Sequence, residues 1–94
     1  MTDRELTPKE IAEVRLNYPP DTRIELMHME DNWAVPHGTR GTVEHVDDAG
    51  QIHMKWDNGR TLAIVPSEDS FRKLTEEEIA EEQSQNESVF EQTM

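Results

Sequence analysis

The chain has no cysteine, few aromatic residues and no long apolar run, and these absences exclude several kinds of structure. Without cysteine, disulfide bonds and thiolate metal sites are excluded, so a hydrophobic core has to hold the 94 residues together. That length fits a single small domain. The first ten residues contain no apolar stretch, and no later run approaches the roughly 20 apolar residues that span a bilayer. We therefore expect a soluble cytoplasmic protein with neither a signal peptide nor a membrane span.

Positive charge is also scarce, because nine Lys and Arg residues stand against 21 Asp and Glu, for a net charge of −12. The excess is uneven: residues 75–94 hold seven acids and no base, whereas residues 1–74 carry −5. Such a field repels nucleic acid, so direct nucleic-acid binding is not expected. A basic protein surface would be attracted instead. The alternative is that the acidity only keeps a small protein soluble.

Capping boxes predict a helix on each side of a central region. Thr7 and Glu10 enclose Pro8, which suits a first helical turn, and Pro19-Pro20 ends this helix. Thr75 and Glu78 form a second box, at the start of an acidic segment. The chain is thus divided into an N-terminal helical segment (1–21), a β region (22–74) and an acidic helix with a flexible tail (75–94).

The central region has the two-residue period of half-buried strands, as in Ile24 and Leu26. Two Asp-x-Gly loops, 48–50 and 57–59, predict hairpins with a glycine in the left-handed conformation. The resulting register pairs Val46 with Ile52, Ile52 with Ile64 and Met54 with Leu62, with Trp56 in the core and a bulge near Glu44-His45. Expected strands at 22–28, 42–47, 51–56, 60–65 and 70–74 would form a small five-stranded antiparallel barrel, so the fold class is mainly β.

Three short runs carry a resemblance to a known family. They are Pro36-His37-Gly38-Thr39-Arg40-Gly41-Thr42-Val43, Val46-Asp47-Asp48-Ala49-Gly50-Gln51-Ile52-His53 and Trp56-Asp57-Asn58-Gly59-Arg60. They resemble the small DUF4314 domains of bacterial phages, plasmids and conjugative elements, over about residues 20–74 with the flanking helices outside. The resemblance implies an SH3-like barrel and a mobile-element origin. It implies no catalytic residue and no cofactor.

The residues themselves favour neither a metal site nor an enzyme. His45 and His53 are cross-strand partners if the first hairpin has no bulge, and Asp47 lies on the same face. A clear third neutral ligand for zinc is missing, however, the expected bulge would move His45, and exposed strand histidines are the commoner case. There is no cysteine nucleophile, glycine-rich phosphate loop or serine-elbow pattern. We therefore expect no catalytic residue, no metal and no cofactor.

Acidic pairs and one tryptophan are the candidate binding residues. Trp33 lies in a polar loop, where it either covers the barrel or is an exposed anchor for a partner. The candidate acidic contacts are Glu30, Asp31, Asp47, Asp48, Glu76, Glu77, Glu78, Glu81 and Glu82.

Spaced carboxylates on a compact domain imitate an array of phosphates. The leading hypothesis is an acidic protein-binding module of a mobile element that inhibits a host nuclease, such as a CRISPR effector, by occupying its basic channel. The alternatives are an accessory or regulatory domain of a phage or conjugative element, and a weak nucleic-acid-binding barrel. A homodimer formed through an edge strand also remains open.

Overall fold

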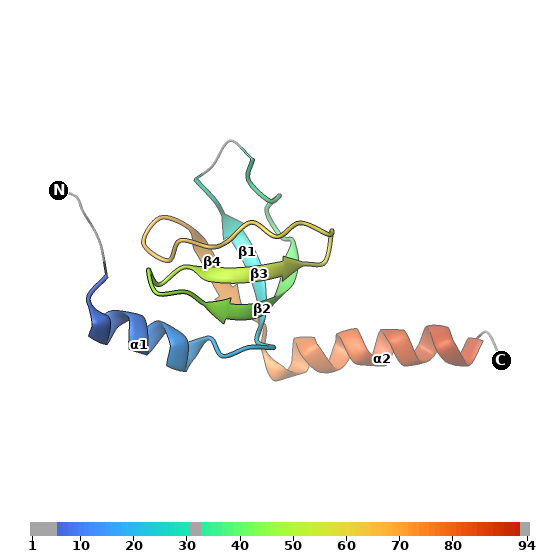
Figure 1. Cartoon of the computed structure of the whole chain (residues 1–94). Helices are drawn as coiled ribbons and strands as arrows, with labels where there is room; N and C mark the ends of the chain where they lie inside the picture. Colours follow the sequence, from blue (N-terminus) through green and yellow to red (C-terminus); the bar gives the residue numbers. More distant parts are fainter. Residues whose placement is uncertain (1–5, 31–32, 93–94) are drawn as a thin grey trace.

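A computed structural model describes the backbone of residues 6–30 and 33–92, and side chains as far as Ser84. Four antiparallel strands form one sheet in the order β3-β2-β1-β4, with a helix before it and a helix after it. Figure 1 shows the two helices extending in opposite directions from the sheet. The elements are α1 (Pro8–Asn17), β1 (Arg23–His28), β2 (Arg40–Val46), β3 (Ile52–Trp56), β4 (Ser70–Lys73) and α2 (Glu76–Gln92).

Helix α1 begins and ends where the sequence predicts. The Thr7 hydroxyl accepts from the Glu10 amide, and the Glu10 carboxylate accepts from the Thr7 amide, so the predicted capping box is present. The helix ends before the Pro19-Pro20 pair. Val14 and Tyr18 pack against the core. Helix α2 continues to Gln92, well beyond the turns marked by its capping box. Within the described residues, no helix is long and apolar enough to cross a membrane.

Two of the three predicted cross-strand pairs are present, whereas no ladder or bridge among the described residues joins Met54 to Leu62. Val46 pairs with Ile52, and the β2–β3 ladder shifts between Val43 and His45, which is the expected bulge. A bridge joins Ile52 to Ile64. Gly50 and Gly59 have φ of +86° and +92°, so both Asp-x-Gly turns use the left-handed conformation that glycine adopts without strain.

The prediction of a closed five-stranded barrel is wrong for the described residues, which form an open four-stranded sheet. Residues 60–65 cross the core as an irregular segment, attached by the single Ile52–Ile64 bridge. The Leu62 carbonyl accepts a hydrogen bond of 2.8 Å from the Trp56 indole nitrogen. Because a side chain uses this carbonyl, and Pro66 follows without an amide hydrogen, a regular fifth strand does not develop.

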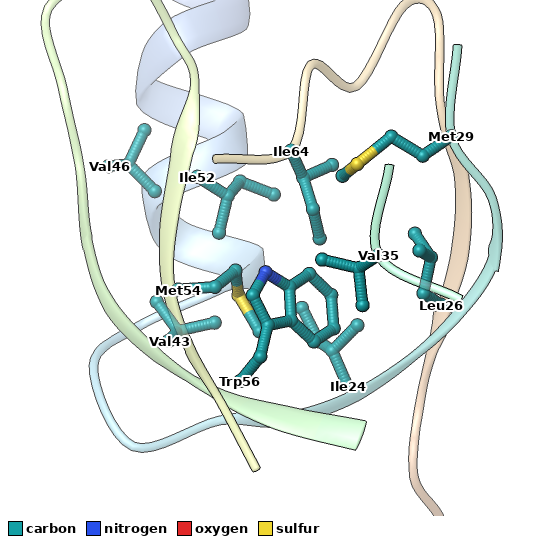
Figure 2. Close-up of a cluster of buried hydrophobic side chains, with 10 residues drawn as sticks. All are labelled: Ile24, Leu26, Met29, Val35, Val43, Val46, Ile52, Met54, Trp56 and Ile64. Carbon is teal, nitrogen blue, oxygen red and sulfur yellow. The ribbon is translucent and has the colours of Figure 1, made fainter. Parts of the chain in front are cut away.

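The core lies between the concave face of the sheet and the segment at 60–65. In Figure 2 the Trp56 indole occupies the middle of the cluster, between Met54 and Val35. Its buried members are Ile24, Leu26, Met29, Val35, Val43, Val46, Ile52, Met54, Trp56 and Ile64. The buried Asp69 carboxylate accepts from the amides of Glu30, at 3.0 Å, and Val65, at 2.8 Å, and so joins the two loops that cover this core.

Trp56 leaves no room for a side chain on the strand beside it. A Cβ atom at Gly41 would lie 2.8 Å from a Trp56 ring carbon and 2.9 Å from the Lys55 carbonyl oxygen. We expect Gly41→Ala to lower the free energy of unfolding by about 1–3 kcal/mol, the usual cost of overpacking a core. Urea denaturation measures this change. Ser70→Ala is the control, because Ser70 is an exposed residue on another strand, β4. Equal stability of the Gly41→Ala and wild-type chains would contradict this packing.

Candidate functional site

The outer face of the sheet, opposite the core, carries alternating charges. In β1, Ile24 and Leu26 point inward, so Arg23 and Glu25 point outward. The register places Glu25 opposite Arg40 on one neighbouring strand and opposite Arg72 on the other. Glu25 therefore lies between two arginines, at the centre of three adjacent strands.

Helix α2 contributes two glutamates to this face. Glu78 and Glu82 are four residues apart, so they lie on the same side of the helix. The position of this side is set by the predicted capping box, in which Thr75 and Glu78 exchange hydrogen bonds of 2.8 and 3.1 Å. Arg72 donates to both Glu78 oxygens, at 2.9 and 2.8 Å, and to Glu25 at 2.7 Å. The first turn of α2 is thus fixed to β4.

Arg23 and Arg40 hold the second turn. Arg23 binds Asp57 through two hydrogen bonds of 2.9 and 2.7 Å, and Glu82 through two of 3.2 and 2.8 Å. Arg40 lies 3.1 Å from Glu82 and 3.8 Å from both Glu25 and Glu78. We call the arginines 23, 40 and 72, together with the carboxylates 25, 57, 78 and 82, the ionic network.

The arginines of the network lower the pKa of three carboxylates, Asp57, Glu78 and Glu82. Hydrogen bonds from Arg72 and from Thr75 lower the pKa of Glu78 from 4.5 to about 2. Hydrogen bonds from Arg23 lower the pKa of Asp57, and those from Arg23 and Arg40 lower the pKa of Glu82, in each case against the opposing effect of burial. A general acid at neutral pH needs a raised pKa, so these three groups are suited to binding charge and not to proton transfer.

A cleft of about 640 Å³ lies between α2 and the outer face of the sheet. Its lining combines network residues with the rim of the sheet and the docked turns of α2: Asp21, Arg23, Thr42, Asp57, Ile79, Glu82 and Gln83. Thr42 accepts a hydrogen bond of 3.0 Å from Arg23. The cleft is therefore open to solvent and polar on the sheet side.

The five predicted acidic contacts of α2 divide into two groups. Glu78 and Glu82 face the sheet and belong to the ionic network. Glu76, Glu77 and Glu81 are exposed. We call these three the outer carboxylate row. The docked side of the helix fixes the direction of these three carboxylates: Glu77 and Glu81 lie on one flank of α2, and Glu76 lies about 100° from Glu77 around the helix axis.

The predicted contacts outside α2 are engaged within the chain. Exposed Glu30 pairs with His28 at 2.8 Å, and Asp48 pairs with Arg15 at 2.9 Å. Asp47 accepts from the amides of the turn it begins, at residues 49 and 51, and from His53 at 2.8 Å. Burial raises the pKa of Asp47, but the bonds from His53 and the two amides outweigh it, so the pKa lies below its ordinary value. Asp31 lies outside the described residues.

Trp33 is 77% exposed at the far end of the loop between β1 and β2. Its carbonyl accepts a hydrogen bond from Arg60. Figure 1 shows this loop, the β2–β3 hairpin and α2 leaving the sheet in different directions. The structure therefore does not gather the predicted contacts into one patch, and α2 is the place where several of them lie together.

The histidines 45 and 53 are cross-strand partners, because the bulge shifts the ladder without separating them. Their rings stack with centroids 4.4 Å apart and an interplanar angle of 8°. Among the described residues, no group of three or more metal-binding side chains is placed to hold a metal ion.

The sequence analysis missed the arginines of the network and their partners Glu25 and Asp57. A signal for them was present, because the alternation that buries Ile24 and Leu26 also places Arg23 and Glu25 on one face. The four-residue spacing of Glu78 and Glu82 marks the complementary side of α2. What the sequence does not show is that the two charged faces meet.

Docking of α2 should weaken in acid. The pKa of Glu78 is lower in the docked state than its ordinary value of 4.5, so its contribution is complete above about pH 4.5 and is lost as the pH falls towards about 2. Amide chemical shifts of residues 76–84, followed by NMR between pH 7 and pH 2, measure this change. In Glu78→Gln the capping box is retained while the charge is absent, so the change over this range should be smaller. Identical titrations of the two proteins would contradict ionic docking.

Comparison with known proteins adds a family but no activity. A search of curated proteins finds no match to this chain. A family model described as a domain of unknown function, DUF4314, matches residues 7–74. The match includes α1, which the sequence analysis expected to lie outside the resemblance, and it ends before α2. The chain belongs to the DUF4314 family.

Proposed function

We propose that this protein is an acidic protein-binding module that presents the outer carboxylate row of α2 to a basic surface on a partner protein. The observation that carries the proposal is the ionic network, which holds one side of α2 against the sheet through Glu78 and Glu82. With that side fixed, Glu76, Glu77 and Glu81 stand on the solvent side in a defined order. An array that is already ordered loses less entropy on binding than a flexible acidic tail.

The spacing of the row suits a surface that binds nucleic acid. Glu77 and Glu81 are four residues apart, so they lie about 6 Å apart along the helix axis. Lys and Arg side chains that neutralise successive phosphates can donate hydrogen bonds to carboxylates in the same way. The net charge of −12 adds long-range attraction, which speeds encounter with a basic partner.

The partner class follows from this charge and from the mobile-element origin implied by the sequence resemblance. We infer a host nuclease as the target, with the protein acting in the cytoplasm as an anti-defence inhibitor of the anti-CRISPR type. The proposed role is one of binding, and the lowered pKa values of Glu78 and Glu82 suit these two carboxylates to binding charge. Exposed Trp33, in the loop between β1 and β2, would make a separate contact with a large partner.

The fold proposal is an opened form of the SH3-like barrel. Residues 60–65 cross back over the core and reach β3 at the Ile52–Ile64 bridge, in the place where a fifth strand would lie. An accessory domain of a phage or conjugative element, acidic for solubility alone, remains the second candidate.

Removal of the outer row should weaken binding more than removal of equal charge elsewhere. The test variant is Glu76→Gln/Glu77→Gln/Glu81→Gln, and the control is Glu13→Gln/Glu44→Gln/Glu68→Gln, whose three carboxylates are also exposed. Partners are captured from bacterial lysate at low and high salt, the salt-sensitive basic protein is purified, and its Kd is measured with each variant. At about 0.5 kcal/mol for each exposed charge, the test variant should lose about tenfold in affinity.

The control variant should lose much less, because its carboxylates belong to α1, to β2 and to the loop before β4 and not to α2. Equal losses for the two variants would show that net charge, and not the row on α2, attracts the partner. A partner retained unchanged by both variants at high salt would favour the accessory-domain alternative.

A further inference from the structure

Basic side chains are concentrated on the outer face of the sheet, where α2 docks. Of the nine Lys and Arg residues in the chain, four lie on the outer face of the sheet: Arg23, Arg40, Lys55 and Arg72. Lys55 stands opposite Thr42, which is itself opposite Arg23, so these positions form a row across β3, β2 and β1. An otherwise acidic chain thus has three arginines and one lysine on one face of its sheet.

The contact that covers this face is almost entirely ionic. Within the described side chains of α2, Ile79 is the one large apolar residue, and it is only half-buried. Partly exposed ion pairs contribute about 0–1 kcal/mol each, and salt weakens them. The helix is therefore held on the arginines by contacts that a competing anion can replace.

Two stacked imidazoles extend the same face beyond the helix. His53 is two residues from Lys55 along β3, so both point outward, and His45 stacks on His53 from β2. Histidine rings are among the side chains on which unpaired bases stack. Sites for single-stranded nucleic acid combine basic side chains that bind the phosphates with exposed rings on which bases stack, and this face has both.

We propose that the outer face of the sheet is a binding site for single-stranded nucleic acid, which α2 blocks by placing Glu78 and Glu82 where phosphates would bind. Guanidinium groups bind carboxylate and phosphate through the same paired hydrogen bonds, as Arg23 and Arg72 do here with the two glutamates. The cleft between α2 and the sheet is the opening at which a nucleic-acid strand would enter and begin to displace the helix. This site does not depend on the proposed protein partner.

Local charge determines whether the face accepts a phosphate. Its four bases are opposed by Glu25, Glu44 and Asp57, by Asp21 at the rim of the cleft and by Asp47, which is bonded to His53, so the uncovered face carries −1. With Glu78 and Glu82 docked, the balance is −3. Charges farther away than about 8 Å are screened at physiological salt, so the docked helix has a larger effect than the acids elsewhere in the chain.

Two matched variants of the full chain test the proposal. Glu78→Gln/Glu82→Gln uncovers the arginines and retains the capping box, whereas Glu77→Gln/Glu81→Gln removes the same charge at the same spacing from the solvent side. Binding of a labelled oligothymidine of about 12 nucleotides is measured by fluorescence anisotropy over a range of salt concentrations. Circular dichroism and urea denaturation establish that both variants are folded.

The first variant should bind the oligonucleotide at least tenfold more tightly than the second. Each phosphate neutralised on a single strand contributes about 0.7 to the slope of log K against log salt concentration. Three uncovered arginines should therefore make the slope of the first variant steeper by about 2. Adding Arg40→Gln or His45→Ala to the first variant should reduce its affinity.

Any of four results would overturn the proposal. The first three are equal binding by the two variants, no binding by either, and binding that Arg40→Gln leaves unchanged. The fourth is equal affinity of the first variant for polyglutamate, because the face would then be a site for acidic protein segments. The proposed function depends on Glu76, Glu77 and Glu81 instead, so the two proposals fail separately.

Discussion

The two-residue alternation of β1 is the constraint on which the other features of this domain depend. Ile24 and Leu26 are fully buried beneath the Trp56 cluster, so their neighbours Arg23 and Glu25 have to face outward. Since β1 lies between β2 and β4, Glu25 meets an arginine from each side. A slip of one residue in this strand would bury the charges and expose the core, so the core register and the ionic network are selected together.

Much of the sheet follows from local chemistry, and for that reason it could be predicted. Asp-x-Gly turns fix the hairpin register through a left-handed glycine, and the capping boxes mark the first residues of both helices. The prediction of a closed barrel was wrong because the pairing of a fifth strand depends on a tertiary contact. The indole of Trp56 donates a hydrogen bond to the Leu62 carbonyl, and nothing in the local pattern of residues 60–65 signals this bond.

The candidate site shows the same division between local and tertiary information. Composition identifies the acidic residues after Thr75, and helical spacing separates their faces, but only the docked structure shows which face is occupied. Arg23, Arg40 and Arg72 are scattered along the sequence and give no basic motif. They become a cluster because three adjacent strands bring them together, so sequence reasoning found the carboxylates and missed their partners.

Net charge is therefore an incomplete guide to what this domain binds. The value of −12 describes the field that a distant molecule meets, and it favours a basic partner. At contact distance the relevant quantity is the charge within a screening length, and that depends on whether α2 is docked. With the helix in place, Glu78 and Glu82 neutralise arginines while Glu76, Glu77 and Glu81 face solvent. The same helix presents negative charge on one side and covers positive charge on the other.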